Sequence, residues 1–460
     1  LRGPFALALA TRSSATCMPI MIESLADRLG FARSRVELLV PLAVSLLRVG
    51  PVVYYVCATL FIAQPAFADT ATDWMELTIK INNVLRAPPG TPPRPDRPRA
   101  TTRAALAMFE ALNAIDPRYE SYLGVQRGDP AASQDAAAAT AAYRVLLDHF
   151  PNLKSSLDDS YAITMAAIPE GSAREAGKTL GEQAAKLALA AGGIDPAIQQ
   201  VPYRPVAVPG VWVATDLPSI DPVDSTFKAW AVSSFTSLRI AAPLLTSERW
   251  AKDYDEAKRL GGAQSKDRTP HQTLMARYRI VPDISPALRA AAEAPGRSQV
   301  QNARLFARVY MAVDDGGVAM ADAKMHYNTW RPITAIRNGD KDANEATERD
   351  ADWEPLLPTP NFPEHPCGHC IYAGSVAAVM AAETGEKPTT GVRVATLITA
   401  NSVLQVLPSW SEWVQQVSDS RIYAGAHFRF ANEAGEAMGR AAGRAVLTKV
   451  MKPLAAKGTR

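Results

Sequence analysis

The dominant feature of this 460-residue sequence is a series of alanine-rich segments with apolar residues at the three- to four-residue spacing of an α-helix. In the first of them, residues 100–116, Ala105, Met108, Phe109 and Leu112 fall at helical spacing. The same patterning predicts helices over 131–149, 170–192, 246–262, 285–294, 298–337, 368–383, 390–406 and 426–455. No segment shows the apolar–polar alternation of a half-buried strand. The predicted fold class is therefore all-α, a multi-helix bundle with no substantial sheet and more helices than a four-helix bundle.

Two proline-rich segments interrupt this pattern. Residues 87–98, APPGTPPRPDRP, cannot form the interior of a helix or a sheet and are predicted to be a loop or a polyproline stretch. Residues 200–224 contain five prolines and are predicted to be irregular. That segment is too long for an ordinary connection, so we expect it to fold over a site.

The N-terminal stretch has the pattern of a secretory signal. Arg48 precedes an apolar run at residues 52–63, and an A-x-A sequence ends at Ala68. This arrangement predicts cleavage after Ala68. The alternative is an uncleaved anchor over residues 36–63, which Arg48 and Pro51 interrupt.

This prediction divides the chain into a leader, residues 1–68, and an all-α domain, residues 69–460, whose motif core spans 322–433. The expected location is the periplasm or the outside of the cell. Contact with a membrane is expected only if the leader is not cleaved.

The charge balance argues against nucleic acid as a partner. The formal net charge is +3, from 49 basic and 46 acidic residues. The leader holds six arginines and three acidic residues, so 43 basic and 43 acidic residues remain after it, with no net charge. Two of the four cysteines, Cys17 and Cys57, also lie in the leader. The remaining pair, Cys367 and Cys370, is too few for a disulfide framework.

The candidate chemistry lies in three short segments: Lys324–Pro332, Pro363–Ser375 and Ser420–Glu433. In the first, Lys324 and Arg331 are seven residues apart, so on a continuous helix they share one face about 10 Å apart along the axis. Pro332 disfavours the helical conformation of Arg331, which is therefore expected at a helix end. Taken alone, such a pair is typical of a solvated helix face.

The second and third segments add histidines. Gly368 opens a predicted helix, where free N–H groups favour an anion, and His369 beside it is a candidate acid or base. Arg421 precedes His427 by six residues and pairs a permanent cation with a candidate nucleophile or metal ligand. Each segment also has a structural interpretation, a capping or core histidine and a surface arginine.

Together the three segments are more specific than any one of them. One lysine, two arginines, two histidines and a glycine-opened helix suit a tetrahedral or trigonal-bipyramidal oxyanion. The cations would neutralise its equatorial oxygens, and the two histidines would act on opposite faces of the central atom.

These residues resemble the signature of the type 2 phosphatidic acid phosphatase (PAP2) and vanadium-dependent haloperoxidase superfamily, in its bacterial haloperoxidase-like branch. The signature is Lys-x6-Arg-Pro, then Pro-Ser-Gly-His, then Ser-Arg-x5-His. All three blocks occur here in order, starting at Lys324, Pro366 and Ser420. The resemblance implies the superfamily's all-α fold, with the site inside helical bundles.

The resemblance also implies roles for single residues. His427 would coordinate vanadium axially, or become the phosphohistidine of a phosphatase. The side chains of Lys324, Arg331 and Arg421 would bind the oxyanion's oxygens, with help from the Gly368 amide. His369 would be the acid or base.

The function expected from this resemblance is a vanadate-dependent haloperoxidase that oxidises halide with hydrogen peroxide to hypohalous species. Its expected cofactor is vanadate, and its expected partners are peroxide, halide and a small organic acceptor. The first alternative is an acid phosphatase acting on a phosphate ester with His427 as the nucleophile. The second is a non-catalytic oxyanion-binding protein. Because superfamily members often dimerise, a homodimer is a further expectation.

The sequence departs from the superfamily pattern at two positions. Cys367 stands in place of the serine and is the oxyanion-binding residue that the resemblance implies there, although a thiol is the weaker hydrogen-bond donor. Phosphatases carry Asp four residues after the nucleophilic histidine, where Ala431 lies here. A carboxylate that orients His427 would then come from Asp322 or Asp419. Phe362 matches an aromatic residue of chloroperoxidases, although one residue does not set the halide.

A competing motif is Cys367-Gly368-His369-Cys370, the C-x-x-C of thiol–disulfide oxidoreductases. That chemistry needs a βαβ context, which the predicted helices do not supply. The two cysteines could still form a local disulfide in an oxidising compartment. Outside the motif, His326 is expected to be structural and His365 to line an entrance.

Overall fold

The computed structural model describes residues 69–84, 96, 99–195, 204–214, 226–279, 284–388, 392–394 and 405–455. The chain divides into two units, residues 1–67 and 68–460, and the elements below belong to the second. The predicted leader and, apart from Asp96, the predicted loop at 87–98 lie outside the described residues.

The described part of the chain is helical, as predicted. Its α-helices are α5 (Thr70–Val84), α6 (Ala100–Ile115), α7 (Gln134–His149), α8 (Lys154–Ala166), α9 (Ser172–Ala190), α10 (Glu248–Gly261), α11 (Pro270–Tyr278), α12 (Ser285–Ala292), α13 (Gln299–Tyr327), α14 (Pro332–Arg337), α15 (Gly368–Thr384), α16 (Trp410–Tyr423) and α17 (Arg429–Lys449). Short 3₁₀ turns are η4 (Pro151–Leu153), η6 (Thr236–Leu238) and η7 (Gly339–Lys341). Two short strands, β1 (Arg393–Val394) and β2 (Gln405–Val406), pair antiparallel.

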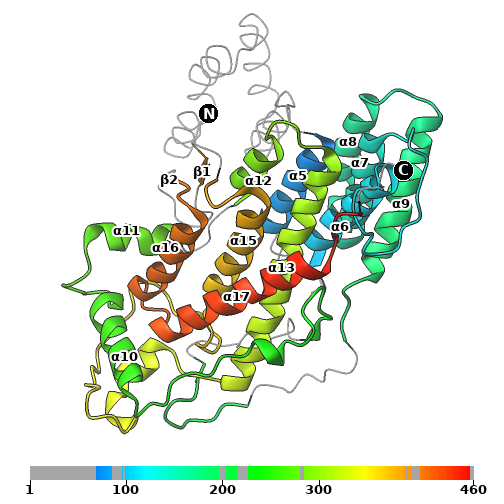
Figure 1. Ribbon diagram of the computed structural model, residues 1–460. Helices are drawn as coiled ribbons and strands as arrows, with labels where there is room; N and C mark the ends of the chain where they lie inside the picture. The colour runs from blue at the N-terminus through cyan, green and yellow to red at the C-terminus, as the bar shows by residue number, and fades with distance from the viewer. Residues whose placement is uncertain are drawn as a thin grey trace, which may run out of the picture. The chain divides into compact units, whose positions relative to one another are not determined.

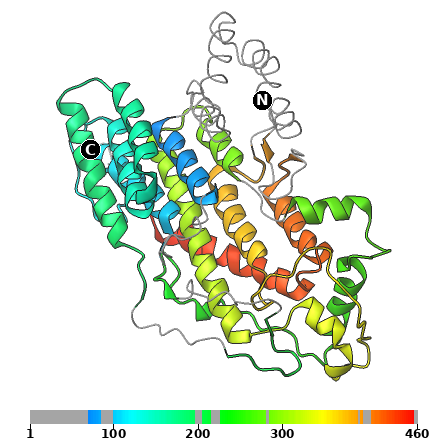
Figure 2. The same ribbon diagram turned by 180° about the vertical axis from the view of Figure 1, so that it is seen from behind.

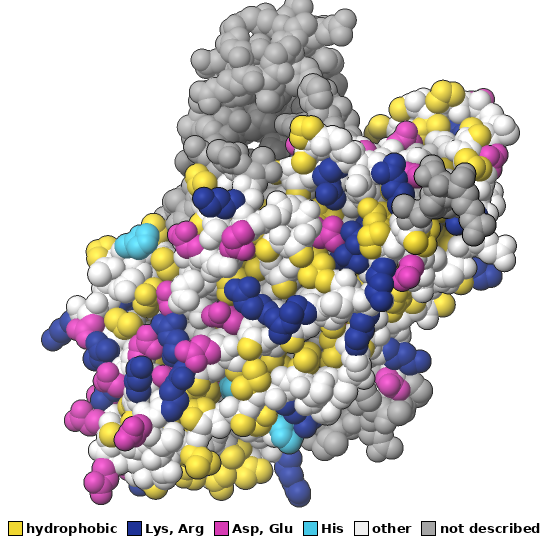
Figure 3. All heavy atoms as spheres, in the orientation of Figure 1, with side chains coloured by type: hydrophobic (Ala, Val, Ile, Leu, Met, Phe, Trp, Pro, Cys, Tyr) yellow, Lys and Arg dark blue, Asp and Glu magenta, His cyan; other side chains and the backbone are white. Residues whose placement is uncertain are grey.

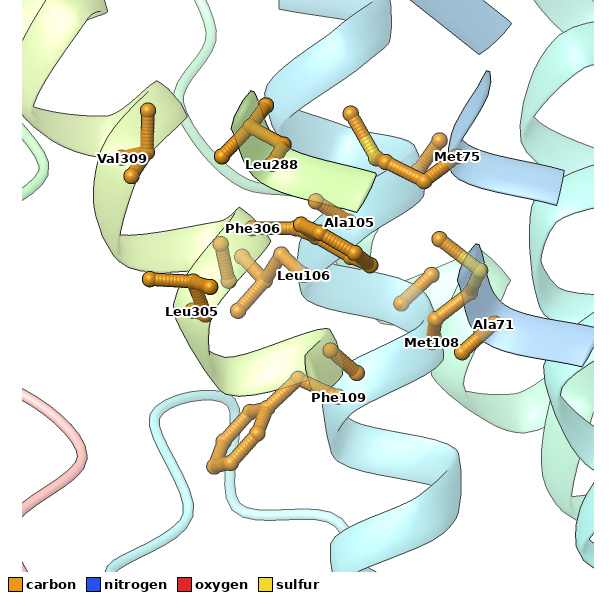
Figure 4. Close-up of a cluster of buried hydrophobic side chains, with 14 of the residues drawn as sticks. Ala71, Met75, Ala105, Leu106, Met108, Phe109, Leu288, Leu305, Phe306 and Val309 are labelled. Atoms are coloured by element: carbon orange, nitrogen blue, oxygen red, sulfur yellow. The ribbon is translucent and has the colours of Figure 1, made fainter. Parts of the chain in front are cut away.

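The helices form two groups that share the long helix α13 (Figures 1 and 2). One group contains α5, α6, α7 and α9, and the other contains α15, α16 and α17. Helix α13 packs on α6 of the first group and on α15 and α17 of the second. The apolar core of the first group is shown in Figure 4, which labels Ala71, Met75, Ala105, Leu106, Met108, Phe109, Leu288, Leu305, Phe306 and Val309. These side chains come from α5, α6, α12 and α13.

Small residues let α15 and α17 approach closely. A Cβ added at Gly374 would lie 2.7 Å from the carbonyl oxygen of Glu436, and one at Gly439 would overlap that of Ile371. The first group uses the same device, because a Cβ at Gly181 of α9 would lie 2.6 Å from the carbonyl oxygen of Ala137 on α7. The alanine-rich composition therefore serves close backbone packing, since small side chains shorten the distance between helix axes.

The exposed surface carries charges of both signs. In Figure 3, Lys and Arg side chains lie among acidic ones, most densely at the lower left, where Figure 1 places α10. On α10 the pairs Arg249–Asp253 and Arg259–Asp255 have N–O distances of 2.7 and 2.8 Å. None of the described helices combines the length and the apolarity needed to cross a membrane.

The predicted continuous helix over 298–337 is wrong, because the chain breaks between α13 and α14. Asn328 adopts a left-handed conformation with φ 46° and ends α13. Arg331 then caps α14, whose first residue is Pro332. Lys324 and Arg331 therefore do not share one helix face, whereas Arg331 does lie at a helix end, where Pro332 places it.

Helix prediction also failed at 390–406 and missed four helices. The described residues of that range contain β1 and β2, in which Val394 lies opposite Gln405, so β-branched residues there favour a strand pair. The missed helices are α5, α8, α11 and α16. For α11 a local signal exists, because Thr269 and Gln272 form a capping box around Pro270.

Residues 362–367, which precede α15, are held by their backbone. The Glu364 N–H donates to the Thr329 carbonyl at 2.9 Å, and the Cys367 N–H donates to the Ala431 carbonyl at 3.0 Å. The proline-rich excursion reaches the same region, because Trp212 N donates to Asn328 O at 2.8 Å. Residues 362–367 are thus hydrogen-bonded both to the link between α13 and α14 and to α17.

His365 lies inside this segment and is fully buried. The expectation that it lines an entrance is therefore wrong. Its Nε2 lies 2.7 Å from the carbonyl oxygen of Ile240, an acceptor, so Nε2 carries the proton. Burial lowers the pKa of His365 to about 4.

Replacing Gly439 with Ala should destabilise the protein by about 1–3 kcal/mol, because the new methyl group forces α15 and α17 apart. The matched control is Gly317→Ala on α13, where an added Cβ meets nothing within 4 Å. That variant should gain about 0.5–1 kcal/mol from helix propensity. Urea unfolding followed by circular dichroism measures both, and equal stability of the two variants would contradict the packing argument.

Acidification should destabilise the fold through His365. The unfolded imidazole takes up a proton near pH 6.5 and the folded one only near pH 4, so the unfolded chain binds more protons between these values. The contribution, about 3 kcal/mol, is complete above pH 6.5 and is lost as the pH falls through 4. Urea unfolding from pH 7 to 4 should show a shallower loss for His365→Gln than for the exposed His271→Gln control. Identical slopes of the unfolding free energy against pH for the two variants would contradict this role of His365.

Candidate oxyanion site

The predicted site residues come from five places in the second helix group. Lys324 lies in the last turn of α13 and Arg331 caps α14. The helix α15 begins with Gly368 and His369, Arg421 lies in the last turn of α16, and His427 follows in the turn before α17. Hydrogen bonds and charge interactions link them, and we call Lys324, Arg331, Glu364, Cys367, Gly368, His369, Arg421 and His427 the oxyanion cluster.

Lys324 and Arg331 both hold the segment before α15. The Lys324 ammonium donates to the carbonyl oxygens of Pro363 and Glu364 at 2.7 and 2.8 Å. Arg331 Nε donates to the carbonyl of Phe362 at 2.9 Å. The Phe362 ring centroid lies 5.1 Å from Lys324 Nζ and 4.8 Å from Arg331 Cζ, within cation–π range. The two cations are thereby fixed from the same short segment.

His427 is held between a carboxylate and a guanidinium. Its Nδ1 lies 2.8 Å from Glu364 Oε1, which also accepts the Phe428 N–H at 3.0 Å. Its Nε2 lies 3.1 Å from Arg331 Nη1. Because Arg331 can only donate, Nε2 is the acceptor and the imidazole proton is on Nδ1, donated to Glu364. The lone pair of His427 is therefore on Nε2, within the cation cluster.

The electrostatics of the cluster follow from burial. Lys324, Arg331 and Arg421 are at most 3% exposed. Burial, and then the neighbouring Arg331, holds the pKa of Lys324 well below its ordinary value, and burial lowers the pKa of Arg331 to about 10. Burial raises the pKa of Glu364 to about 7. The pKa of His427 lies well below its ordinary value, because of burial first and the three cations next. All four pKa shifts show that burial disfavours the charged form of the group. A bound anion would stabilise the charged forms of Lys324, Arg331 and His427, so the cluster favours an anion.

Several buried polar atoms in the cluster have no protein hydrogen-bond partner. They include Nη2 of Arg331, and Nε and Nη1 of Arg421. Glu364 is the carboxylate whose charge acts on Lys324 and Arg331, and a buried cation without a partner is costly. An oxyanion would accept from these N–H groups and offset the charge, so the residues present fit a group such as phosphate or vanadate.

The N-terminus of α15 contributes to the cluster. Cys367 is its N-cap, with Sγ accepting the Cys370 N–H at 3.3 Å. Gly368 follows, and a Cβ there would overlap the sulfur of Met320 on α13. The absence of a side chain at Gly368 thus lets α13 and α15 meet, and the first-turn N–H groups of a helix favour an anion. Cys367 takes the capping place that a serine would occupy.

His369 is the second histidine of the cluster. It is half-buried, and its charge is one of the influences that lower the pKa of His427, after burial and the three cations. His369 is thus partly exposed, whereas His427 is buried. Because of this exposure, His369 can exchange protons with solvent.

The carboxylate that orients His427 is Glu364, a residue that sequence reasoning missed. Asp322 instead pairs with Arg239 at 2.7 Å, and Asp419 pairs with Arg429 at 2.5 Å, so both predicted candidates are wrong. The sequence does not indicate this contact, because Glu364 and His427 are 63 residues apart. The available signal was an acidic residue inside the motif segment PEHPCGHC.

Aromatic side chains back the His427 side of the cluster. Trp250 lies 4.9 Å from the Phe428 ring and 6.1 Å from the Trp330 ring, centroid to centroid. Phe430 stacks on Phe428 at 5.5 Å. These rings keep the neighbours of His427 and Arg331 in an apolar setting, which strengthens their electrostatic interactions. His326, by contrast, is exposed on α13, where its ring contacts Tyr327.

Metal binding by a group of side chains is a separate question. The described residues contain no group of three or more His, Cys, Asp or Glu side chains able to hold a metal ion. A single histidine nitrogen within a group of cations would suit an oxyanion whose central atom takes one protein ligand.

Sequence comparison finds proteins that are similar to parts of this chain. Residues 304–456, which contain the whole cluster, match the family model described as the VCPO second helical-bundle domain. Vanadium chloroperoxidase from Curvularia inaequalis is 29% identical over 188 residues, which cover 33% of this chain and 30% of that protein. Residues 1–79 match the sodium:dicarboxylate symporter family, a match that shares no residue with the cluster.

Structural comparison extends over most of the chain. A bacterial vanadium-dependent iodoperoxidase matches with a TM-score of 0.67 and 18% identity, covering 86% of this chain and 99% of that one. A holo-type bacterial vanadium-dependent chloroperoxidase matches with a TM-score of 0.62 and 17% identity, covering 84% and 95%. The chain therefore shares the all-helical fold of these solved structures, and its residues 304–456 are similar in sequence to the second helical-bundle domain of vanadium chloroperoxidase.

Proposed function

We propose that this protein is a vanadate-dependent haloperoxidase that oxidises halide with hydrogen peroxide to a hypohalous species. The observation that carries the proposal is the arrangement around His427. Its Nε2 lone pair lies beside a buried guanidinium, and Nη2 of Arg331 and Nε and Nη1 of Arg421 lack protein acceptors. A basic nitrogen facing unsatisfied cationic donors suits an oxyanion whose central atom accepts one axial ligand.

Vanadate would be held by Lys324, Arg331, Arg421 and the Gly368 amide, with His427 Nε2 as its protein ligand. When bound, vanadate supplies Lewis-acid activation of peroxide toward attack by halide. The protein's part is to neutralise the oxyanion, to exclude water on the aromatic side, and to keep Nε2 unprotonated. Glu364 does the last by accepting the Nδ1 proton, which fixes the tautomer.

His369 would be the acid or base of the reaction. Its half-buried place at the first turn of α15 lets it exchange protons with solvent. It would take a proton from peroxide as peroxide binds, and return it to the departing oxygen. The remaining substrates would be a halide and a small organic acceptor.

A phosphatase with the same cluster is the second candidate, and Glu364 favours it. A phosphoenzyme histidine needs a carboxylate on its other nitrogen, and the sequence lacks the usual Asp at Ala431. Glu364 Oε1, 2.8 Å from Nδ1, supplies that carboxylate from a different segment. His427 would then attack phosphorus, and His369 would protonate the leaving alcohol.

One preparation of the protein, divided with and without orthovanadate, separates these functions. Peroxide-dependent bromination of a chromogenic acceptor is expected only with orthovanadate, and His427→Ala should lower it about 100-fold or more. The matched control is His326→Ala, which removes an exposed histidine outside the cluster and should leave the rate unchanged.

The other outcomes of this assay are equally informative. Phosphate-ester hydrolysis without orthovanadate, suppressed when it is added, would make the protein a phosphatase. Orthovanadate binding with neither activity would leave the non-catalytic oxyanion-binding protein.

Glu364 should control oxyanion affinity through His427. Glu364→Ala leaves the Nδ1 proton without an acceptor, so orthovanadate binding measured by calorimetry should weaken about 10- to 100-fold. Glu364→Gln keeps an acceptor oxygen and should lose less. Glu433→Gln, at an exposed carboxylate paired with Arg249, is the control. Equal affinity for Glu364→Ala and Glu433→Gln would contradict the assigned role.

A further inference from the structure

The two cysteines at the start of α15 carry out no chemical step of the proposed reaction. Cys367 is the N-cap and Cys370 lies three residues later in the first turn, and both are buried free thiols. The Cys370 N–H donates to Cys367 Sγ at 3.3 Å, which places the two residues across one helical turn. The Cα atoms of residues three apart in a helical turn are about 5 Å apart, within the Cα–Cα range that a disulfide spans.

The two sulfurs are electrostatically different. Burial would raise the pKa of Cys367, but the hydrogen bond from the Cys370 thiol and the charge of Arg421 bring it below its ordinary value. Burial and the neighbouring Cys367 sulfur hold the pKa of Cys370 well above its ordinary value. Cys367 is therefore the thiol of the pair that ionises more readily and Cys370 the one that stays protonated longer, the division of roles found between an attacking thiol and a resolving thiol.

Arg421 supplies a second, independent observation. Its guanidinium is 3% exposed, and its Nε and Nη1 have no protein acceptor. The charged neighbours that act on it are the sulfurs of Cys367 and Cys370. A buried unpartnered cation beside a thiol stabilises the thiolate, in the same way that it would bind an oxyanion.

Access to the pair is from one side. Helix α17 covers the other side, because a Cβ at Gly435 would lie 3.0 Å from Cys370 Cβ. Gly368 and His369, between the two cysteines, are half-buried, so the first turn of α15 is where solvent approaches. A molecule as small as hydrogen peroxide would reach Cys367 by the same approach that a peroxide-using site requires.

We infer that Cys367 and Cys370 form a dithiol that hydrogen peroxide oxidises to an intramolecular disulfide. Cys367 sulfur attacks one peroxide oxygen, an S–O bond forms, the O–O bond breaks, and hydroxide leaves. Cys370 sulfur then attacks the Cys367 sulfenic acid, an S–S bond forms, and water leaves with the thiol proton. Overall, two thiols and one peroxide give one disulfide and two waters. The inference depends on the proposed function only in supposing that peroxide is a natural substrate.

The test uses the full chain, free of vanadate and halide, so that its outcome does not depend on haloperoxidase activity. After exposure to hydrogen peroxide and quenching, the protein is denatured, alkylated and digested with trypsin. The peptide that carries both cysteines is expected to resist alkylation and to be lighter by two hydrogen atoms. Dithiothreitol should restore both thiols. The leader cysteines Cys17 and Cys57 lie on other peptides and do not interfere.

Two variants test the order of the steps. In Cys370→Ser, the sulfenic acid has no resolving thiol and should be trapped on Cys367 by dimedone. In Cys367→Ser, the Cys370 thiol should disappear about tenfold more slowly than in the native protein. Circular dichroism confirms that each variant is folded.

Two results would overturn the inference. One is full alkylation of both thiols after peroxide treatment of the native protein, which needs no variant. The other is oxidation of Cys370 in Cys367→Ser at the native rate, because Cys370 would then react without the attacking thiol.

Discussion

The buried carboxylate of Glu364 is the interaction on which the site depends. It accepts from His427 Nδ1 and from the Phe428 N–H through one oxygen, and its own backbone carbonyl accepts from Lys324. It is also the carboxylate whose charge acts on Lys324 and Arg331. A single residue thereby sets the tautomer of the histidine and supplies the partial charge balance without which three buried cations would not be tolerated.

That balance is incomplete, because N–H groups of Arg331 and Arg421 lack protein acceptors. Burial disfavours charge on Lys324, Arg331 and Glu364 alike, so the folded protein retains strain in the form of unpaired N–H groups. The close packing of α15 on α17, permitted by glycines such as Gly439, keeps these groups from relaxing toward water. An oxyanion would complete the cluster and is therefore bound by a pre-arranged site, which is the economical way to obtain affinity.

The sequence was informative where spacing alone decides the outcome. Helical periodicity predicted the fold class, and Pro332 predicted that Arg331 lies at a helix end. It failed where tertiary contacts decide, since Asn328 breaks α13 by a left-handed turn and separates the helix faces of Lys324 and Arg331. Glu364 was missed for the same reason: its partner His427 is 63 residues away, and no local pattern signals the pair.

The substitution at Cys367 joins the two chemistries of the site. A serine there caps α15 with a hydroxyl that stays neutral, whereas a thiol beside Arg421 can ionise. The same unpartnered guanidinium that would hold an oxyanion therefore stabilises a sulfur anion when the oxyanion is absent. Cys370, three residues later, has a raised pKa and stays protonated longer. Anion binding at the start of α15 and the reaction of Cys367 with peroxide would then have the same cause, the excess of buried positive charge.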